Sequence, residues 1–272
     1  MKTLNGILLL VLLLSCGDDN FRKVEKLGGF RVLGIKAANP EITESGAIQT
    51  VSLQLIVSDI NGGGRTVNGQ VVSCIDPGVG YGAEVSCDHD PTAGPVNFDI
   101  VFSSIGIGTL FTGIATHNVS VPANIITLLG ARDQFNGLAY LTVFTFEVDG
   151  ETHKAFKRIV VTNRTSLNSN PLSSNIQKNG IDINAFPQNG DELSVMANSP
   201  ETYTYRTVEN IDETRTEELQ VAWYVSEGEL SRSKTYVDES TEYEGSAPAG
   251  DSVVVAIVRD DRGGLDFKVY SP

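Results

Sequence analysis

The sequence predicts an all-β protein with two tandem immunoglobulin-like β-sandwich domains behind an N-terminal leader and a short tether. Three observations lead to this fold class. Apolar and polar side chains alternate along many short segments, as in strands with one buried face. Asp149-Gly150 separates two such segments and suits a type I′ hairpin turn. Trp223, the only tryptophan, lies on the alternating apolar face of a third segment, as in strand C of an immunoglobulin-like sandwich.

The N-terminus has the features of a signal peptide. Lys2 precedes the apolar run 7–14, and these eight residues are too few to cross a bilayer core, which takes about 20 in a helix. Leu13-Leu14-Ser15-Cys16 resembles the lipobox of bacterial lipoproteins. The resemblance implies cleavage before Cys16, a diacylglyceryl thioether on its sulfur, and acylation of the new amine by a fatty acid such as palmitate. An ordinary signal peptide with an incidental cysteine is the alternative.

The predicted first domain begins after a polar, glycine-flanked segment, 17–29, which we expect to be a tether. Pairing of part of it as an edge strand is the alternative, because Val24 and Leu27 are apolar. Strand 50–58 is predicted to be half-buried, with Val51, Leu53, Leu55 and Val57 on its inner face. The other strands expected in this domain are 31–37, 67–74, 96–102, 109–115, 138–148 and 151–162.

Two further segments complete the prediction. Pro122 and Gly130 bracket an expected short helix that plugs the sandwich end rather than binding a membrane. The Asn/Ser-rich segment 163–175 is the predicted domain boundary. Strands follow at 181–186, 192–198, 218–226, 251–259 and 265–270, with a turn at 260–264. The predicted organisation is signal peptide 1–15, lipidated tether 16–29, first domain 30–163, linker 164–178 and second domain 179–272.

The cysteines and the charge limit the compartment and the partners. If Cys16 carries lipid, Cys74 and Cys87 remain as a pair in an oxidising compartment, and we predict a disulfide between them. Two free, buried thiols are the alternative. The bridge would close a loop of about 14 residues and contribute about 3 kcal/mol. The formal charge of −14 disfavours nucleic acid and anionic lipid headgroups, so no nucleic-acid partner is expected.

Several short motifs occur along the chain: 30–37 with Pro40-Glu41, the strand 51–59, the Cys74/Cys87 loop, the Pro122 segment ending in Leu128-Leu129, Asn170-Pro171, Trp223 with Gly228, and 259–264. Together they resemble uncharacterised immunoglobulin-like surface lipoproteins of predatory Gram-negative bacteria. Such proteins usually have a tryptophan before the first loop cysteine, where this chain has Val71-Val72-Ser73-Cys74. The resemblance implies tandem immunoglobulin-like domains on an outer-membrane lipid anchor, and it implies no reaction and no catalytic residues.

No motif of a catalytic or cofactor site is recognisable, since HExxH, GxSxG, Walker and CxxC patterns are missing. No catalytic residue, metal ligand or cofactor is therefore predicted. Asp88-His89-Asp90 is the densest group of potential metal ligands, but it lies among glycine and proline and indicates a solvated loop. Calcium stays open as an alternative, although aspartate also favours turns through bonds to its own backbone. The acidic turn residues concerned are Asp59, Asp76, Asp88, Asp90, Asp260 and Asp261.

The expected function is that of a lipid-anchored lipoprotein of a bacterial outer membrane, on its periplasmic or cell-surface face. It would act as a structural or binding module for protein interaction or adhesion. The expected partners are the bilayer, through acylated Cys16, and an unidentified protein or glycan. A hydrolase or carbohydrate-acting enzyme on a sandwich scaffold and an accessory part of an envelope machine are the alternatives. The candidate contact surface is the loop-rich end that holds the cysteine loop, with Asp76, Tyr81, Asp88, His89 and Asp90.

Overall fold

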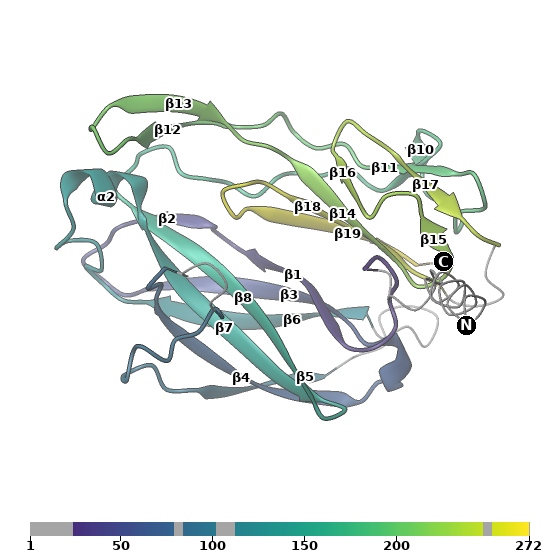
Figure 1. The fold of residues 1–272 in the computed structure, drawn as a ribbon, viewed down its shortest axis with the longest axis horizontal. Coiled ribbons are helices and arrows are strands. Elements are labelled where there is room, and N and C mark those ends of the chain that lie inside the picture. Colours follow the sequence, from purple (N-terminus) through teal and green to yellow (C-terminus); the bar gives the residue numbers. More distant parts are fainter. Residues whose placement is uncertain (1–23, 79–83, 102–111, 247–251, 272) are drawn as a thin grey trace, which may run out of the picture.

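A computed structural model describes residues 24–78, 84–101, 112–246 and 252–271 of the chain. The lipobox, Cys16 and Tyr81 lie outside these residues. The described chain forms two β-sandwiches and one short α-helix, α2 (Ala131–Asn136). The predicted all-β sandwich class is confirmed (Figure 1).

The first sandwich packs a three-stranded sheet, in the order β1-β3-β6, against a five-stranded sheet, in the order β2-β8-β7-β4-β5. Neighbouring strands are antiparallel except β2, which runs parallel to β8. The inner faces enclose a core in which Leu53, Leu55, Phe144 and Ile159 are fully buried. The strands are β1 (Arg31–Ala37), β2 (Glu41–Thr43), β3 (Gln49–Ser58), β4 (Thr66–Ile75), β5 (Val96–Val101), β6 (Thr112–Val121), β7 (Leu138–Val148) and β8 (Glu151–Thr162).

The alternation of apolar and polar residues predicted the positions of most of these strands. β1, β7 and β8 have the predicted bounds, and Asp149 and Gly150 have positive φ angles of 54° and 79°, as a type I′ turn requires. The strand predicted at 109–115 is β6, which continues to Val121. The short strand β2 was not predicted.

The helix predicted between Pro122 and Gly130 is wrong. The segment is a series of turns, and α2 begins only after Gly130. Asn124 has a φ of 59°, which a right-handed helix does not contain, and the Glu44 carboxylate accepts the backbone N–H groups of Asn124 (2.8 Å) and Ile126 (3.1 Å). Ile126 is fully buried against the core, so the segment does plug the sandwich.

The second sandwich packs the sheet β16-β14-β18-β19 against the sheet β10-β9-β11-β17-β15. Trp223 on β14 is fully buried, and its Nε1 donates to Thr235 Oγ1 at 2.9 Å, which confirms its predicted inward position. The strands are β9 (Gln177–Lys178), β10 (Ile181–Asp182), β11 (Glu192–Ser194), β14 (Gln220–Val225), β15 (Glu229–Leu230), β16 (Lys234–Tyr236), β17 (Thr241–Glu244), β18 (Val254–Arg259) and β19 (Leu265–Tyr270).

A separate hairpin reaches from the second sandwich toward α2 of the first (Figure 1). It consists of β12 (Thr202–Arg206) and β13 (Asp212–Thr216), and it was not predicted. Its link to α2 is the Asn136 carboxamide, which donates to the Arg206 carbonyl oxygen (2.7 Å) and accepts the Arg206 N–H (2.9 Å). The Arg206 guanidinium lies over the Phe135 ring at 4.2 Å.

The start of the described chain belongs to the fold. Val225 N donates to the Glu25 carbonyl oxygen (2.9 Å), and Leu27 N donates to the Val225 carbonyl oxygen (2.8 Å). Leu27 is buried among side chains of both sandwiches. The predicted tether 16–29 is therefore wrong at its C-terminal end, because burial of the apolar Leu27 side chain is more favourable than its exposure in a solvated tether. Pairing of this segment with a strand, the alternative, is what the structure shows.

Candidate functional site

The cysteine loop contains the predicted disulfide. Cys74 and Cys87 are bonded, with their Cα atoms 5.8 Å apart, so the disulfide is confirmed. The two half-cystines pack with Leu141 and Val143 on the outer face of the five-stranded sheet. Val85 and Ala93 pack against the same cluster, so the described part of the loop folds back over the sheet face. It does not project from the sandwich end as an open finger.

The aspartates of the loop serve local turns. The Asp76 carboxylate accepts the Gly78 N–H (3.0 Å) and pairs with Arg158 on β8. Asp90 Oδ1 accepts the backbone N–H (2.9 Å) and the hydroxyl (2.6 Å) of Thr92, and these bonds hold the pKa of Asp90 below its ordinary value.

The remaining predicted loop residues do not converge with these. His89 Nε2 donates to the Ile75 carbonyl oxygen at 3.1 Å, and Asp88 is exposed. Tyr81 lies outside the described residues. Within the described ranges, no group of three or more His, Cys, Asp or Glu side chains is arranged to hold a metal ion.

An open depression of about 420 Å³ lies between this loop and the sheet. Its floor contains Val72 and Val143, and Asp88, Asp90 and Lys154 contribute charged groups to its lining. Lys154 Nζ also pairs with Glu84 Oε1 at 2.7 Å. The depression combines apolar and charged groups of both signs beside a cross-linked loop, which suits contact with a polar macromolecular surface.

The two sandwiches meet in an apolar layer. Leu33 and Ile56 from the first sandwich pack with Val255, Ile257 and Leu265 from the second. Ile56 is fully buried although it points away from the first core. The prediction that strand 50–58 is half-buried is therefore wrong at this end, because the second sandwich covers its outer face.

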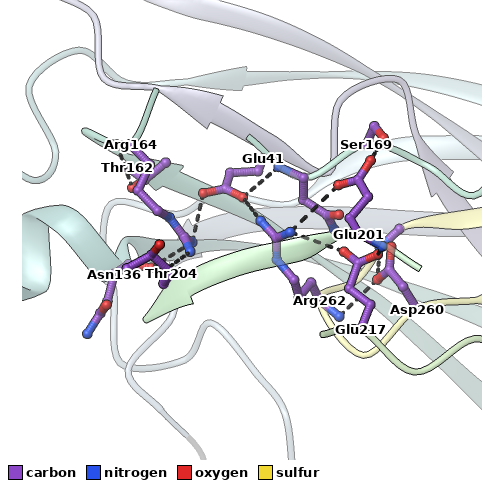
Figure 2. Close-up of polar contacts among 12 residues, drawn as sticks. Glu41, Asn136, Thr162, Arg164, Ser169, Glu201, Thr204, Glu217, Asp260 and Arg262 are labelled. Atoms are coloured by element: carbon purple, nitrogen blue, oxygen red, sulfur yellow. Dashed lines mark hydrogen bonds and ion pairs between the residues drawn. The ribbon is translucent and has the colours of Figure 1, made fainter. Parts of the chain in front are cut away.

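A buried ionic network continues this layer (Figure 2). Glu41 on β2 lies between two guanidinium groups: Arg164 Nη2 is 2.8 Å from its Oε1, and Arg262 Nη2 is 2.7 Å from its Oε2. Only 2% of the Glu41 side chain is exposed. Arg262 Nη1 also donates to Glu217 Oε1 at 3.1 Å, and its guanidinium lies over the Tyr203 ring at 4.4 Å. One arginine therefore joins β2 of the first sandwich to the hairpin segment of the second.

The 260–264 turn holds Arg262 in this position. Asp260 Oδ1 accepts the backbone N–H groups of Arg262 (2.9 Å) and Gly264 (2.6 Å), and Asp260 Oδ2 accepts Asn168 Nδ2 (3.3 Å). Lys157 on β8 donates to the Gly263 carbonyl oxygen. The turn was predicted, but its insertion between the sandwiches was not.

Burial shifts the protonation of three groups in this network. Desolvation lowers the pKa of Lys157 to about 8 and raises that of Glu217 to about 7. Burial also raises the pKa of Asp260, against the effect of its bonds from Gly264 and Arg262.

The predicted linker is bonded to both sandwiches. Asn168 N donates to Glu41 Oε2 (2.8 Å). Asn170 Nδ2 donates to the Ala37 carbonyl oxygen (2.8 Å), and Asn170 Oδ1 accepts the Leu265 N–H (2.9 Å). The segment lies between β8 and β9 and acts as a strap across the junction.

Sequence reasoning did not single out Glu41, Arg164, Glu217 or Arg262 as a group. Their separations in the chain follow no periodicity, and Glu41 and Arg262 are 221 positions apart. One signal was present: Ile56 is the apolar exception among the outward positions Ser52, Gln54 and Ser58 of its strand. An apolar residue at such a position indicates a covered sheet face.

No protein-family model and no curated protein matches the sequence. Among solved structures, red sea bream transglutaminase aligns with a TM-score of 0.28 and 11% identity, over 90% of this chain and 31% of that one. Escherichia coli alpha-2-macroglobulin activated by porcine elastase aligns with a TM-score of 0.26 and 10% identity, over 92% of this chain and 22% of that one. The chain thus spans less than a third of either protein, and similarity at this level carries no functional argument. No helix among the described residues is long and apolar enough to cross a membrane.

Proposed function

We propose that the protein is a lipid-anchored lipoprotein of a bacterial outer membrane and works as a rigid binding or structural module. The observation that carries the proposal is the use of the cysteines. Two of the three form the Cys74–Cys87 disulfide, and the third, Cys16, follows Leu13-Leu14-Ser15 at the end of the apolar run. A disulfide is favoured in oxidising compartments outside the cytosol, which is where a lipobox directs a protein.

The packing of the sandwiches supports a display role. Junctions with an apolar layer and buried ion pairs limit relative motion, whereas domains joined by a solvated linker move independently. The described chain starts beside Val225 at the end of β14, and α2 and the β12–β13 hairpin lie at the opposite end of the molecule (Figure 1). An anchor before residue 24 would hold that opposite end away from the membrane.

The contact surface that we propose is the described cysteine loop with the depression beside it. The disulfide and the Asp76–Arg158 pair fix the loop on the sheet, which lowers the conformational entropy lost when a partner binds. The partner would be a protein or glycan with a polar surface, because Asp88, Asp90 and Lys154 offer charges of both signs.

The anchor is tested by fractionation of cells that express the full chain. Cys16→Ala should move the protein from the membrane fraction to the soluble fraction, because the lipobox then lacks the thiol that accepts a diacylglyceryl group. The matched control is the Cys74→Ser/Cys87→Ser double variant, which loses the same kind of side chain elsewhere and should stay with the membrane. Full retention of Cys16→Ala in the membrane fraction would contradict the proposal.

A further inference from the structure

We propose that the junction between the sandwiches is a proton-sensitive lock: a proton taken up by the carboxylates around Arg262 tightens the contact, and its loss loosens it. The inference is independent of the lipid anchor, because it concerns only the described junction. Its failure would leave the localisation proposal untouched.

The Arg262 guanidinium has more acidic partners than its single positive charge can balance. Arg262 lies 2.7 Å from Glu41, 3.1 Å from Glu217 and 3.8 Å from Glu201. Its own charge balances one carboxylate, and Glu41 has Arg164 as a second cation at 2.8 Å. Glu217 therefore has only part of a single positive charge in a place where water is largely excluded, whereas Glu201 is 31% exposed and also accepts a hydrogen bond from the Ser169 hydroxyl.

Glu217 is the carboxylate with the least compensation. Only 3% of its side chain is exposed, and both Asp260 and Glu201 act on it as like charges. Its partners are Arg262 and the Glu201 N–H, which donates to Oε2 at 3.1 Å. A proton on Glu217 removes the repulsion and keeps Arg262 free to pair with Glu41.

The other charged groups of the junction interact with residues other than Glu217. Lys157 on β8 is attracted by Asp260 and repelled by Arg259 on β18, and it donates to the Gly263 carbonyl oxygen. Arg259 Nη2 donates to the Leu33 carbonyl oxygen at 2.6 Å. Asp266 on β19 pairs with Lys36 on β1 at 2.8 Å. Burial alone would raise the pKa of Asp266, but its bonds from Lys36 and Ser173 hold that pKa below the ordinary value.

The direction of the pH effect follows from these shifts. Burial raises the pKa of Glu217 from 4.5 to about 7, so the closed junction binds a proton more tightly than the open one. The closed junction is therefore most favoured at pH values below 4.5, the ordinary pKa of a glutamate, and it weakens as pH rises through about 7. Asp260 acts in the same direction. Lys157, whose pKa is lowered from 10.5 to about 8, gives the opposite slope, but only above pH 8. Protonation of Asp266 would weaken the junction, but only at pH values below the ordinary pKa of an aspartate.

Hydrogen exchange of the linker tests the lock in the full chain. The amides of Asn168 and Ser173 donate to junction carboxylates, on Glu41 and Asp266, so their protection reports closure. Between pH 5.5 and 7.5, after correction for intrinsic exchange, opening should increase with pH by severalfold and by at most about tenfold per pH unit for one proton. A peptide from β7 serves as the internal reference, because His117 titrates inside the first core and can change global stability.

Two variants assign the proton. Glu217→Gln keeps the shape and an acceptor oxygen, and it should flatten the slope; Glu213→Gln, on the exposed β13 of the same hairpin, should leave it unchanged. If Glu217→Gln does not fold, Glu201→Gln removes a like charge and should shift the midpoint to lower pH. A flat or inverted slope in the unmodified chain, or an unchanged slope in folded Glu217→Gln, would overturn the proposal.

Discussion

Arg262 is the side chain through which the 260–264 turn contacts the first sandwich. Its side chain is 9% exposed, and its guanidinium lies between Glu41, Glu217 and the ring of Tyr203. A planar group with five donors can serve two carboxylates and a ring face at once, which a lysine cannot do. Substitution here would leave Glu217 buried without its guanidinium partner and Glu41 with Arg164 alone.

Arg262→Ala should lower the free energy of unfolding by about 3 kcal/mol, because breaking a buried ion pair leaves uncompensated charge. Urea unfolding at neutral pH measures the change. The control is Arg215→Ala: Arg215 lies over Tyr205 at 4.2 Å and pairs with Glu213, but at the exposed surface, so its loss should lower stability far less than the loss of Arg262. Equal losses for the two variants would show that the junction network contributes no more than a surface pair.

The elements that alternation predicted are those with one face on a sandwich core. β1, β3, β4, β5, β7, β8 and β19 fall within a residue of their expected bounds at both ends, since apolar residues recur at alternate positions in their sequences. The β12–β13 hairpin was not predicted, because every residue of β13 is exposed and the sequence of β13 has no alternating apolar residues. The segment after Pro122 has helix-like end residues, but the Glu44 carboxylate and the positive φ of Asn124 fix it as turns.

The cysteine loop is the element whose order depends on a covalent bond. In the chain-entropy model, removal of the disulfide in Cys74→Ser/Cys87→Ser should cost about 3 kcal/mol of stability. The variant should also lose capture of a partner by crosslinking on intact cells, because residues 84–95 would no longer be held over Leu141 and Val143. Unchanged unfolding together with unchanged capture would remove the loop as a candidate contact surface.

At the scale of the whole molecule, the junction joins the two sandwiches through an apolar layer and a buried ionic network. The sequence indicated two sandwiches and the segment between them, but not that they form a single body. Glu41, Arg164, Glu217 and Arg262 come from four separate parts of the chain, and they meet where Leu33 and Ile56 pack on Val255 and Leu265. Such a meeting of distant residues leaves no local pattern in a single sequence.

Packing of this kind should make the two sandwiches unfold together. Each sandwich has its own core, so two separate transitions would be the outcome for independent domains. The shared apolar layer and the strap from Arg164 to Ser173 couple them, because neither can open without exposing the cluster around Ile56 and Ile257.

Differential scanning calorimetry of the full chain at pH 6 measures this coupling directly. The expected result is one endotherm whose calorimetric and van't Hoff enthalpies agree. Two resolved endotherms, or a calorimetric enthalpy about twice the van't Hoff value, would mean that the sandwiches unfold independently and that the protein is not one rigid module.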